Sequence, residues 1–107
     1  MFTRSMVSLV KESISVVHDA PHRVFRALNG TGTELGHLEY RLVDSSPHKA
    51  VDFYHTYTRP AAQGHGVAAK MVACGLDWAQ SEKFSVIPTC SYVAAFLKKN
   101  PQYSSNL

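Results

Sequence analysis

The sequence predicts a single α/β (α+β) domain with a mixed, largely antiparallel sheet and two helices packed on it. The first half of the chain alternates polar and apolar side chains in short segments separated by turn residues, as β-strands do. A later segment repeats its apolar residues at three- and four-residue steps, as an amphipathic helix does. The length of 107 residues, with 45% hydrophobic content, fits one globular domain. The expected order is β-β-β-β-α-β-α.

Four segments have the character of strands: residues 14–18, 23–28, 34–43 and 50–58. Asp19-Ala20-Pro21 and Asn29-Gly30-Thr31-Gly32 supply turn chemistry between them. Because sequential strands joined by tight turns generally pair with each other, an antiparallel meander is expected.

The pattern changes after Arg59-Pro60. Apolar residues at helical spacing predict a helix of about four turns; they are Val67, Ala68, Met71, Val72, Leu76 and Ala79. Residues 85–88 form a short expected strand, in which Pro88 indicates an edge or the end of pairing. Residues 92–99 predict a second helix that Asn100-Pro101 terminates.

The domain is expected over residues 13–107, preceded by a flexible segment at residues 1–12. Residues 1–11 contain Arg4 and Lys11 but no acid, a faint likeness to a mitochondrial presequence. Because this segment is too short to serve as a clear presequence, we expect a cytoplasmic or nuclear protein and keep mitochondria as the alternative. No run approaches the roughly eighteen apolar residues of a membrane span, so no membrane association is expected.

Charge and cysteine content narrow the function classes. The formal charge is +3, but Lys and Arg are scattered and only Lys98-Lys99 stand together. A nucleic-acid-binding protein usually has a basic stripe, so this class is disfavoured. Cys74 and Cys90 are expected as thiols rather than as a disulfide.

The six histidines do not predict a metal site. No two have the i, i+4 spacing that would direct two imidazoles from one helix to one ion. His18 and His22 have that separation in number, but Pro21 breaks any helix between them. We therefore expect scattered, solvent-exposed histidines and no metal.

The junction between the fourth strand and the first helix predicts an anion site. A helix begins with N–H groups that have no intrahelical acceptor and with the positive end of its dipole. Gly64 and Gly66 would let a phosphate approach the amides from Gln63 to Ala68, and Arg59 would add a positive charge. The alternative is that the glycines only turn the chain and permit close packing. The lysine and hydroxyl of a nucleotide P-loop are absent.

Cys90 follows the short strand and precedes the last helix. A helix N-terminus favours thiolate, so this position suits a reactive sulfur. The alternative is an inert, packed cysteine, which is the expectation for Cys74 in mid-helix.

Four separated motifs resemble a small subfamily of the Gcn5-related N-acetyltransferases over about residues 13–103. They are His55-Thr56-Tyr57, Gly64-His65-Gly66-Val67-Ala68, Pro88-Thr89-Cys90-Ser91-Tyr92-Val93 and Lys99-Asn100-Pro101. The resemblance implies that coenzyme A lies where the fourth and fifth strands diverge, with pantetheine along Tyr54 to Thr58 and the thioester near Cys90. The chain departs from the family's loop pattern at Ala61, where Gln or Arg is usual.

The resemblance implies an acetyl-CoA-dependent N-acetyltransferase acting on an amine of unknown identity. The candidate catalytic residues are Cys90, either as a nucleophile or as a residue that only lines the site, and His55 or Tyr92 for the proton transfer. The implied cofactor-binding residues are Tyr57, Thr58, Arg59, Gln63, Gly64, His65, Gly66, Val67 and Ala68. The alternatives are a non-catalytic acyl-CoA-binding or interaction module and a basic nucleic-acid or adaptor protein. The oligomeric state stays open, a homodimer included.

Overall fold

The computed structural model describes residues 13–45 and 48–106. The segment 1–12, predicted to be flexible, lies outside these residues. The strands are β1 Ser15–Asp19, β2 Val24–Leu28, β3 Glu34–Ser45, β4 His48–Thr58 and β5 Ser85–Ile87. The α-helices are α2 Val67–Ser81 and α3 Ser91–Lys99.

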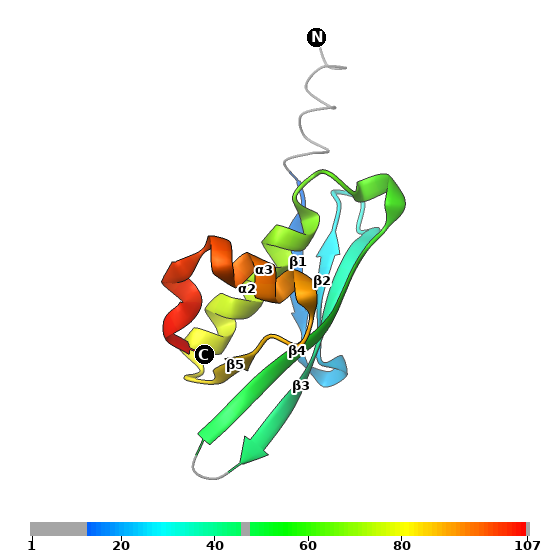
Figure 1. The fold of residues 1–107 in the computed structure, drawn as a ribbon. Coiled ribbons are helices and arrows are strands. Elements are labelled where there is room, and N and C mark those ends of the chain that lie inside the picture. The colour runs from blue at the N-terminus through cyan, green and yellow to red at the C-terminus, as the bar shows by residue number, and fades with distance from the viewer. Residues whose placement is uncertain (1–12, 46–47, 107) are drawn as a thin grey trace.

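The strands form one sheet in the order β1-β2-β3-β4-β5, with both α-helices on the same face (Figure 1). Strands β1 to β4 pair antiparallel in chain order, and β5 returns parallel to β4 after α2. The predicted fold class and element order are therefore confirmed. The long β3–β4 hairpin extends beyond the rest of the sheet (Figure 1).

Three short 3-10 helices accompany the predicted elements: η1 Ala20–His22 connects β1 to β2, η2 Pro60–Ala62 connects β4 to α2, and η3 Pro101–Asn106 follows α3. A proline stands at the first or second position of η1 and of η2, where its fixed φ suits a helical turn and its missing N–H costs nothing. Helix η2 matters most for function because it leads the chain from β4 to the start of α2.

The core lies between the sheet and α2. The predicted apolar positions of α2 are buried except for Ala68, which is half-buried, and side chains from β2, β3 and β4 that face them are buried too. At Gly75 the helix approaches the sheet closely, because an added Cβ would lie only 3.0 Å from atoms of Leu38 and Phe53. None of the described helices is long and apolar enough to cross a membrane.

A β-bulge in β4 changes which side chains face the helices. Tyr40 pairs with Phe53 but Glu39 pairs with His55, so Tyr54 is an extra residue opposite β3. Side chains normally alternate along a strand. Here Phe53 faces the core, Tyr54 and His55 are both exposed, and Thr56 returns to the helix face, where it contacts Cys90. The bulge therefore reverses the alternation of the last part of β4.

Candidate functional site

A cleft of about 420 Å³ opens beside the end of β4, at the N-terminus of α2 and the first turn of α3. This volume lies within the range of small-molecule sites. Its lining comes from β4, the loop before α2, and both helices, and comprises Thr56, Thr58, Gln63, Gly64, Gly66, Val67, Ala68, Ala69 and Tyr92. Seven of the residues predicted from the sequence are therefore brought together here: Thr58, Gln63, Gly64, Gly66, Val67, Ala68 and Tyr92.

The cleft opens because β5 is short. It pairs with β4 only from Ala50 to Asp52. The Cys90 N–H then donates to the Phe53 carbonyl at 2.9 Å, and from there the chain turns into α3. Within the part of the chain that the structure describes, no strand pairs with this edge of β4 beyond Asp52. The edge remains available to an extended ligand that carries amide groups.

The bend before α2 has the backbone of an anion site. Gly64 and Gly66 adopt φ values of +85° and +76°, in the left-handed region that favours glycine. No heavy atom lies within 4 Å of a Cβ built on either glycine, so the space in front of the bend is open. Gln63 steadies the bend, since its Nε2 donates to the Thr58 carbonyl at 3.2 Å.

The first turn of α2 adds donors and a positive potential. The first intrahelical bond runs from the Lys70 N–H to the Gly66 carbonyl, so the preceding amides have no helical acceptor. Gly66 is the N-cap, no side chain caps the turn, and the turn contains no acidic residue. An anion bound here would accept from free amides without competition from a carboxylate.

Cys90 lies beside the cleft as the N-cap of α3. Its Sγ is 3.2 Å from Thr56 Oγ1. Burial alone would raise the pKa of the Cys90 thiol. Hydrogen bonding by the Thr56 hydroxyl and the favourable amides of Val93 and Tyr92 outweigh it, so the pKa lies below its ordinary value. By contrast, partial burial of its sulfur raises the pKa of Cys74, although the residue as a whole is exposed and not packed as expected.

Tyr92 lines the cleft one helical residue after Ser91. Partial burial raises the pKa of its phenol. The hydroxyl therefore stays protonated at neutral pH and suits a proton donor better than a base.

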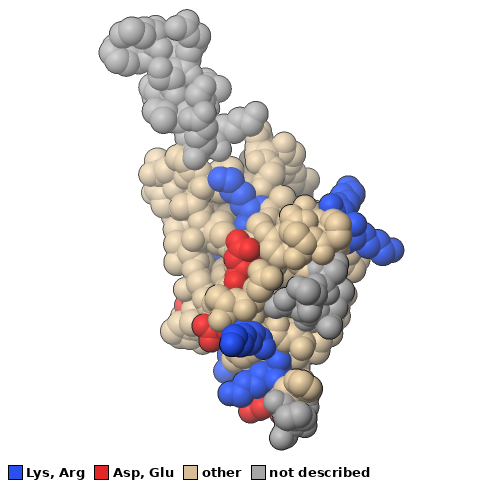
Figure 2. Space-filling model, turned by 90° about the vertical axis from the view of Figure 1, so that its left-hand side faces the viewer, with Lys and Arg blue, Asp and Glu red and all other residues tan. Residues whose placement is uncertain are grey.

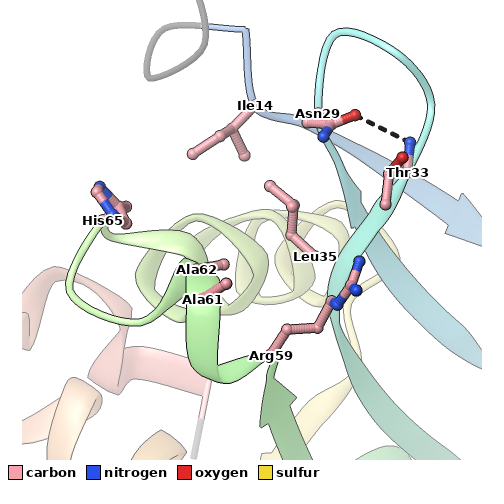
Figure 3. Close-up of a pocket in the computed structure, with 8 residues that line it drawn as sticks. All are labelled: Ile14, Asn29, Thr33, Leu35, Arg59, Ala61, Ala62 and His65. Carbon is pink, nitrogen blue, oxygen red and sulfur yellow. Dashed lines mark hydrogen bonds between the residues drawn. The ribbon is translucent and has the colours of Figure 1, made fainter. Parts of the chain in front are cut away.

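Arg59 and His65 face a different hollow. A second pocket, of about 260 Å³, lies on the other side of the η2 turn and is lined mainly by Ile14, Leu35 and small residues (Figure 3). The Arg59 Nη1 donates to the Glu34 carbonyl at 3.2 Å, which holds the guanidinium at this pocket. The structure therefore places these two predicted cofactor-binding residues at this pocket and not in the lining of the cleft.

His55 and Tyr57 lie on the outer face of the sheet, opposite the helices. Both rings contact the ring of His37, with centroids 5.9 and 5.4 Å apart. Thr56, between them, points to the helix face and Cys90. The structure thus does not bring His55 together with Cys90 and Tyr92. The bulge at Tyr54 is the physical reason.

Thr56 and Ala69 line the cleft but were not among the predicted site residues, although Thr56 belongs to the His55-Thr56-Tyr57 motif. Ala69 could have been predicted, because it lies in the first turn of α2 and the first turn of any helix has more than two free N–H groups. The motif locates Thr56 on this strand but not the direction of its side chain, since that depends on a bulge that forms only when β3 and β4 pair.

Comparison with known proteins identifies the family. Residues 23–107 match the sequence profile described as GCN5-related N-acetyl-transferase. The chain belongs to the GCN5-related N-acetyltransferase family. Among curated proteins, bovine Protein NATD1 is 34% identical over 97 residues, which cover 88% of this chain and 82% of the relative.

Solved structures agree on the GCN5-related fold. A GCN5-like protein from Staphylococcus aureus has a TM-score of 0.61 at 20% identity, covering 88% of this chain and 87% of its own. A chain of the NatC complex, solved with Gag peptide and CoA, has a TM-score of 0.57 at 16% identity, covering 92% and 74%. At these identities the likeness shows the fold alone. The predicted family and the mixed fold are both confirmed.

Proposed function

We propose that this protein is an acetyl-CoA-dependent N-acetyltransferase that transfers the acetyl group to an amine. One observation carries the proposal: the left-handed bend at Gly64 and Gly66 and the free amides of α2 face an open cleft that ends beside Cys90. Family membership and the CoA-bound NatC relative support coenzyme A as the ligand of this cleft.

Each part of acetyl-CoA is matched by groups of the protein that bind it. The pyrophosphate accepts hydrogen bonds from the amides between Gln63 and Ala69, and the glycines leave room for it. Pantetheine lies along the unpaired edge of β4 and pairs its amides with backbone groups there, much as an added strand would. The thioester then lies near Thr56 and Cys90.

In the direct route, the amine nitrogen attacks the thioester carbonyl and forms the new C–N bond. The C–S bond then breaks, the amine loses a proton to a base, and the coenzyme A thiolate takes a proton from Tyr92. The raised pKa of Tyr92 supports this donor role. The His55 side chain lies on the outer face of the sheet, away from Thr56 and Cys90, so the geometry does not favour it as this base.

A covalent route competes with the direct one because the pKa of Cys90 is lowered. The Cys90 thiolate would attack the thioester, release coenzyme A and form an acetyl-cysteine, which the amine would then cleave. This route predicts ping-pong kinetics and a protein that gains one acetyl group without any amine present.

The test is release of free coenzyme A from acetyl-CoA in the presence of a panel of primary amines and lysine peptides. Amine-dependent release supports the transferase, whereas saturable binding with no release for any amine would leave a non-catalytic coenzyme A module. Mass spectrometry of wild type and Cys90→Ala separates the routes. Turnover that persists in Cys90→Ala, with no acetylated wild-type protein, eliminates the covalent route.

A further inference from the structure

The outer face of the sheet carries a cluster of three ligand-type side chains. His37 and Glu39 are neighbours on the same face of β3, and His55 is the cross-strand partner of Glu39 on β4. One ligand atom from each of these residues lies within 4.8 Å of the others. Because β3 and β4 pair along most of their length, the three Cα positions are fixed by the sheet.

The spacing is close to that of a three-ligand zinc site. Zinc binds imidazole and carboxylate at about 2.0–2.2 Å in tetrahedral geometry, so two ligand atoms lie about 3.4 Å apart. His37 Nε2 is 3.2 Å from Glu39 Oε2, and His55 Nε2 is 4.0 Å from the same oxygen. The ligand nitrogens of His37 and His55 lie within 4.8 Å of each other. The His55 side chain is 52% exposed, so it has the freedom to move toward both Glu39 and His37.

Surrounding contacts orient two of the three ligands. Tyr54 donates its hydroxyl to Glu39 Oε1 at 3.2 Å, which leaves Oε2 facing the histidines. His37 Nδ1 lies 3.1 Å from Glu34 Oε2. In a neutral imidazole that donates Nδ1–H to a carboxylate, Nε2 presents its lone pair, here toward Glu39 and His55. This carboxylate–histidine arrangement is the usual support of a metal-bound imidazole.

Glu34 is itself held in place. Its Oε1 accepts from Arg26 Nη1 at 2.9 Å, while Asp19 shares the same guanidinium. The Tyr57 ring packs on His37 at 5.4 Å between centroids, which restricts rotation of the imidazole. The cluster is therefore supported by a layer of contacts and does not consist of three isolated surface side chains.

We propose that His37, Glu39 and His55 bind a divalent transition metal of the zinc class, with the fourth position open to water or to an external ligand. Two imidazoles and one carboxylate suit Zn²⁺ and its neighbours, whereas Mg²⁺ and Ca²⁺ prefer oxygen alone. Glu34 supports His37 from outside the coordination sphere. This site is independent of the proposed acetyl transfer, since it lies on the opposite face of β4 from the cleft.

The competing explanation is that hydrogen bonds and ion pairs alone connect the histidines to the carboxylates, with no metal ion. Zinc titration followed by calorimetry distinguishes the two. The experiment uses the full chain with Cys74→Ser and Cys90→Ser, so that no thiol competes for the ion. We expect one zinc per chain with micromolar affinity, a loss of binding in His37→Ala and in His55→Ala, and no response to Mg²⁺.

Two variants calibrate the result. His22→Ala removes an imidazole whose side chain is 72% exposed and lies outside the cluster, so zinc affinity should not change. Glu34→Gln removes only the supporting carboxylate and should weaken zinc binding by about tenfold. Circular dichroism checks that each variant is folded.

Proton–nitrogen correlation NMR of the histidine side chains provides a test without substitutions at the cluster. On addition of zinc, the signals of His37 and His55 should shift, while those of the other four histidines stay in place. Absence of zinc binding to the wild-type chain, wild-type affinity in His37→Ala or His55→Ala, or shifts centred on other histidines would overturn the proposal.

Discussion

The two faces of β4 carry different chemistry within a few residues of each other. On the helix face, Thr56 contacts Cys90 at 3.2 Å and, with Thr58, lines the cleft. On the outer face, Tyr54 and His55 join Glu39 in a polar cluster. One extra residue in the strand decides which side chain faces which way. The comparison teaches that the position of the bulge, rather than residue type, decides which side chains of β4 face the cleft and which face the outer surface.

The helix-bearing face also differs from a nucleic-acid-binding surface in its charge pattern. Figure 2 shows its lysines and arginines in separate small groups, with acidic residues among them, as the scattered sequence distribution indicates. The cleft on this side relies on backbone amides at the start of α2 for its positive potential.

The largest expected effect is on stability and tests the bulge directly. Phe53, 1% exposed, packs in the core, whereas its neighbour Tyr54 is 37% exposed. Phe53→Ala should lower the free energy of unfolding by about 3–5 kcal/mol, and Tyr54→Ala by about 1 kcal/mol or less. Urea denaturation of both variants measures the difference. Similar losses in the two would mean that the bulge does not set the orientation described.

The next effect concerns the bend before α2, and the chain provides its own control. Gly64 and Gly32 have nearly the same φ, +85° and +84°, and both face open space. Replacing either with alanine should strain the backbone by about 1–2 kcal/mol. Only Gly64→Ala places a methyl group where the pyrophosphate is proposed to bind.

Isothermal titration should therefore show weaker acetyl-CoA binding in Gly64→Ala, by about tenfold or more for a loss of 1.4 kcal/mol, and unchanged binding in Gly32→Ala. Equal acetyl-CoA affinities in folded Gly64→Ala and Gly32→Ala would mean that the pyrophosphate does not bind at this bend.

A smaller effect separates the two cysteines by pH. Because the pKa of Cys90 is lowered and that of Cys74 is raised, alkylation of Cys90 should reach half its maximal rate at a lower pH than alkylation of Cys74. Thr56→Val removes a hydrogen bond that favours the thiolate, so the midpoint for Cys90 should move upward. Iodoacetamide labelling followed by mass spectrometry measures both residues in one sample. A Cys90 midpoint unmoved by Thr56→Val would show that the hydroxyl does not stabilise the thiolate.

Much of the fold was predictable because its signals are local. Alternation, turn residues and the helical spacing from Val67 to Ala79 identified the elements to within a few residues. The bend was predictable as well, because Gly64 and Gly66 mark a conformation that other residues avoid. The 3-10 helices were not expected, since a proline in a turn sequence fits an open turn equally well.

The orientation of side chains at the end of β4 could not be predicted. Strict alternation groups Phe53, His55 and Tyr57 on one face, and the bulge defeats this grouping because it depends on pairing with β3. The proximity of His37 and His55 has the same origin. The i, i+4 spacing of histidines detects metal ligands on a helix, whereas strand pairing brings together His37 and His55, which are eighteen positions apart in sequence.

The most direct test of the account is the melting temperature of the wild-type protein as acetyl-CoA is added. A ligand at 100 times its dissociation constant stabilises the folded state by about 2.7 kcal/mol, which is about 10 °C or more for a domain of this size. We predict a saturable rise of this order, reduced in Gly64→Ala and retained in Gly32→Ala. A melting temperature that does not change at millimolar acetyl-CoA would contradict the central claim.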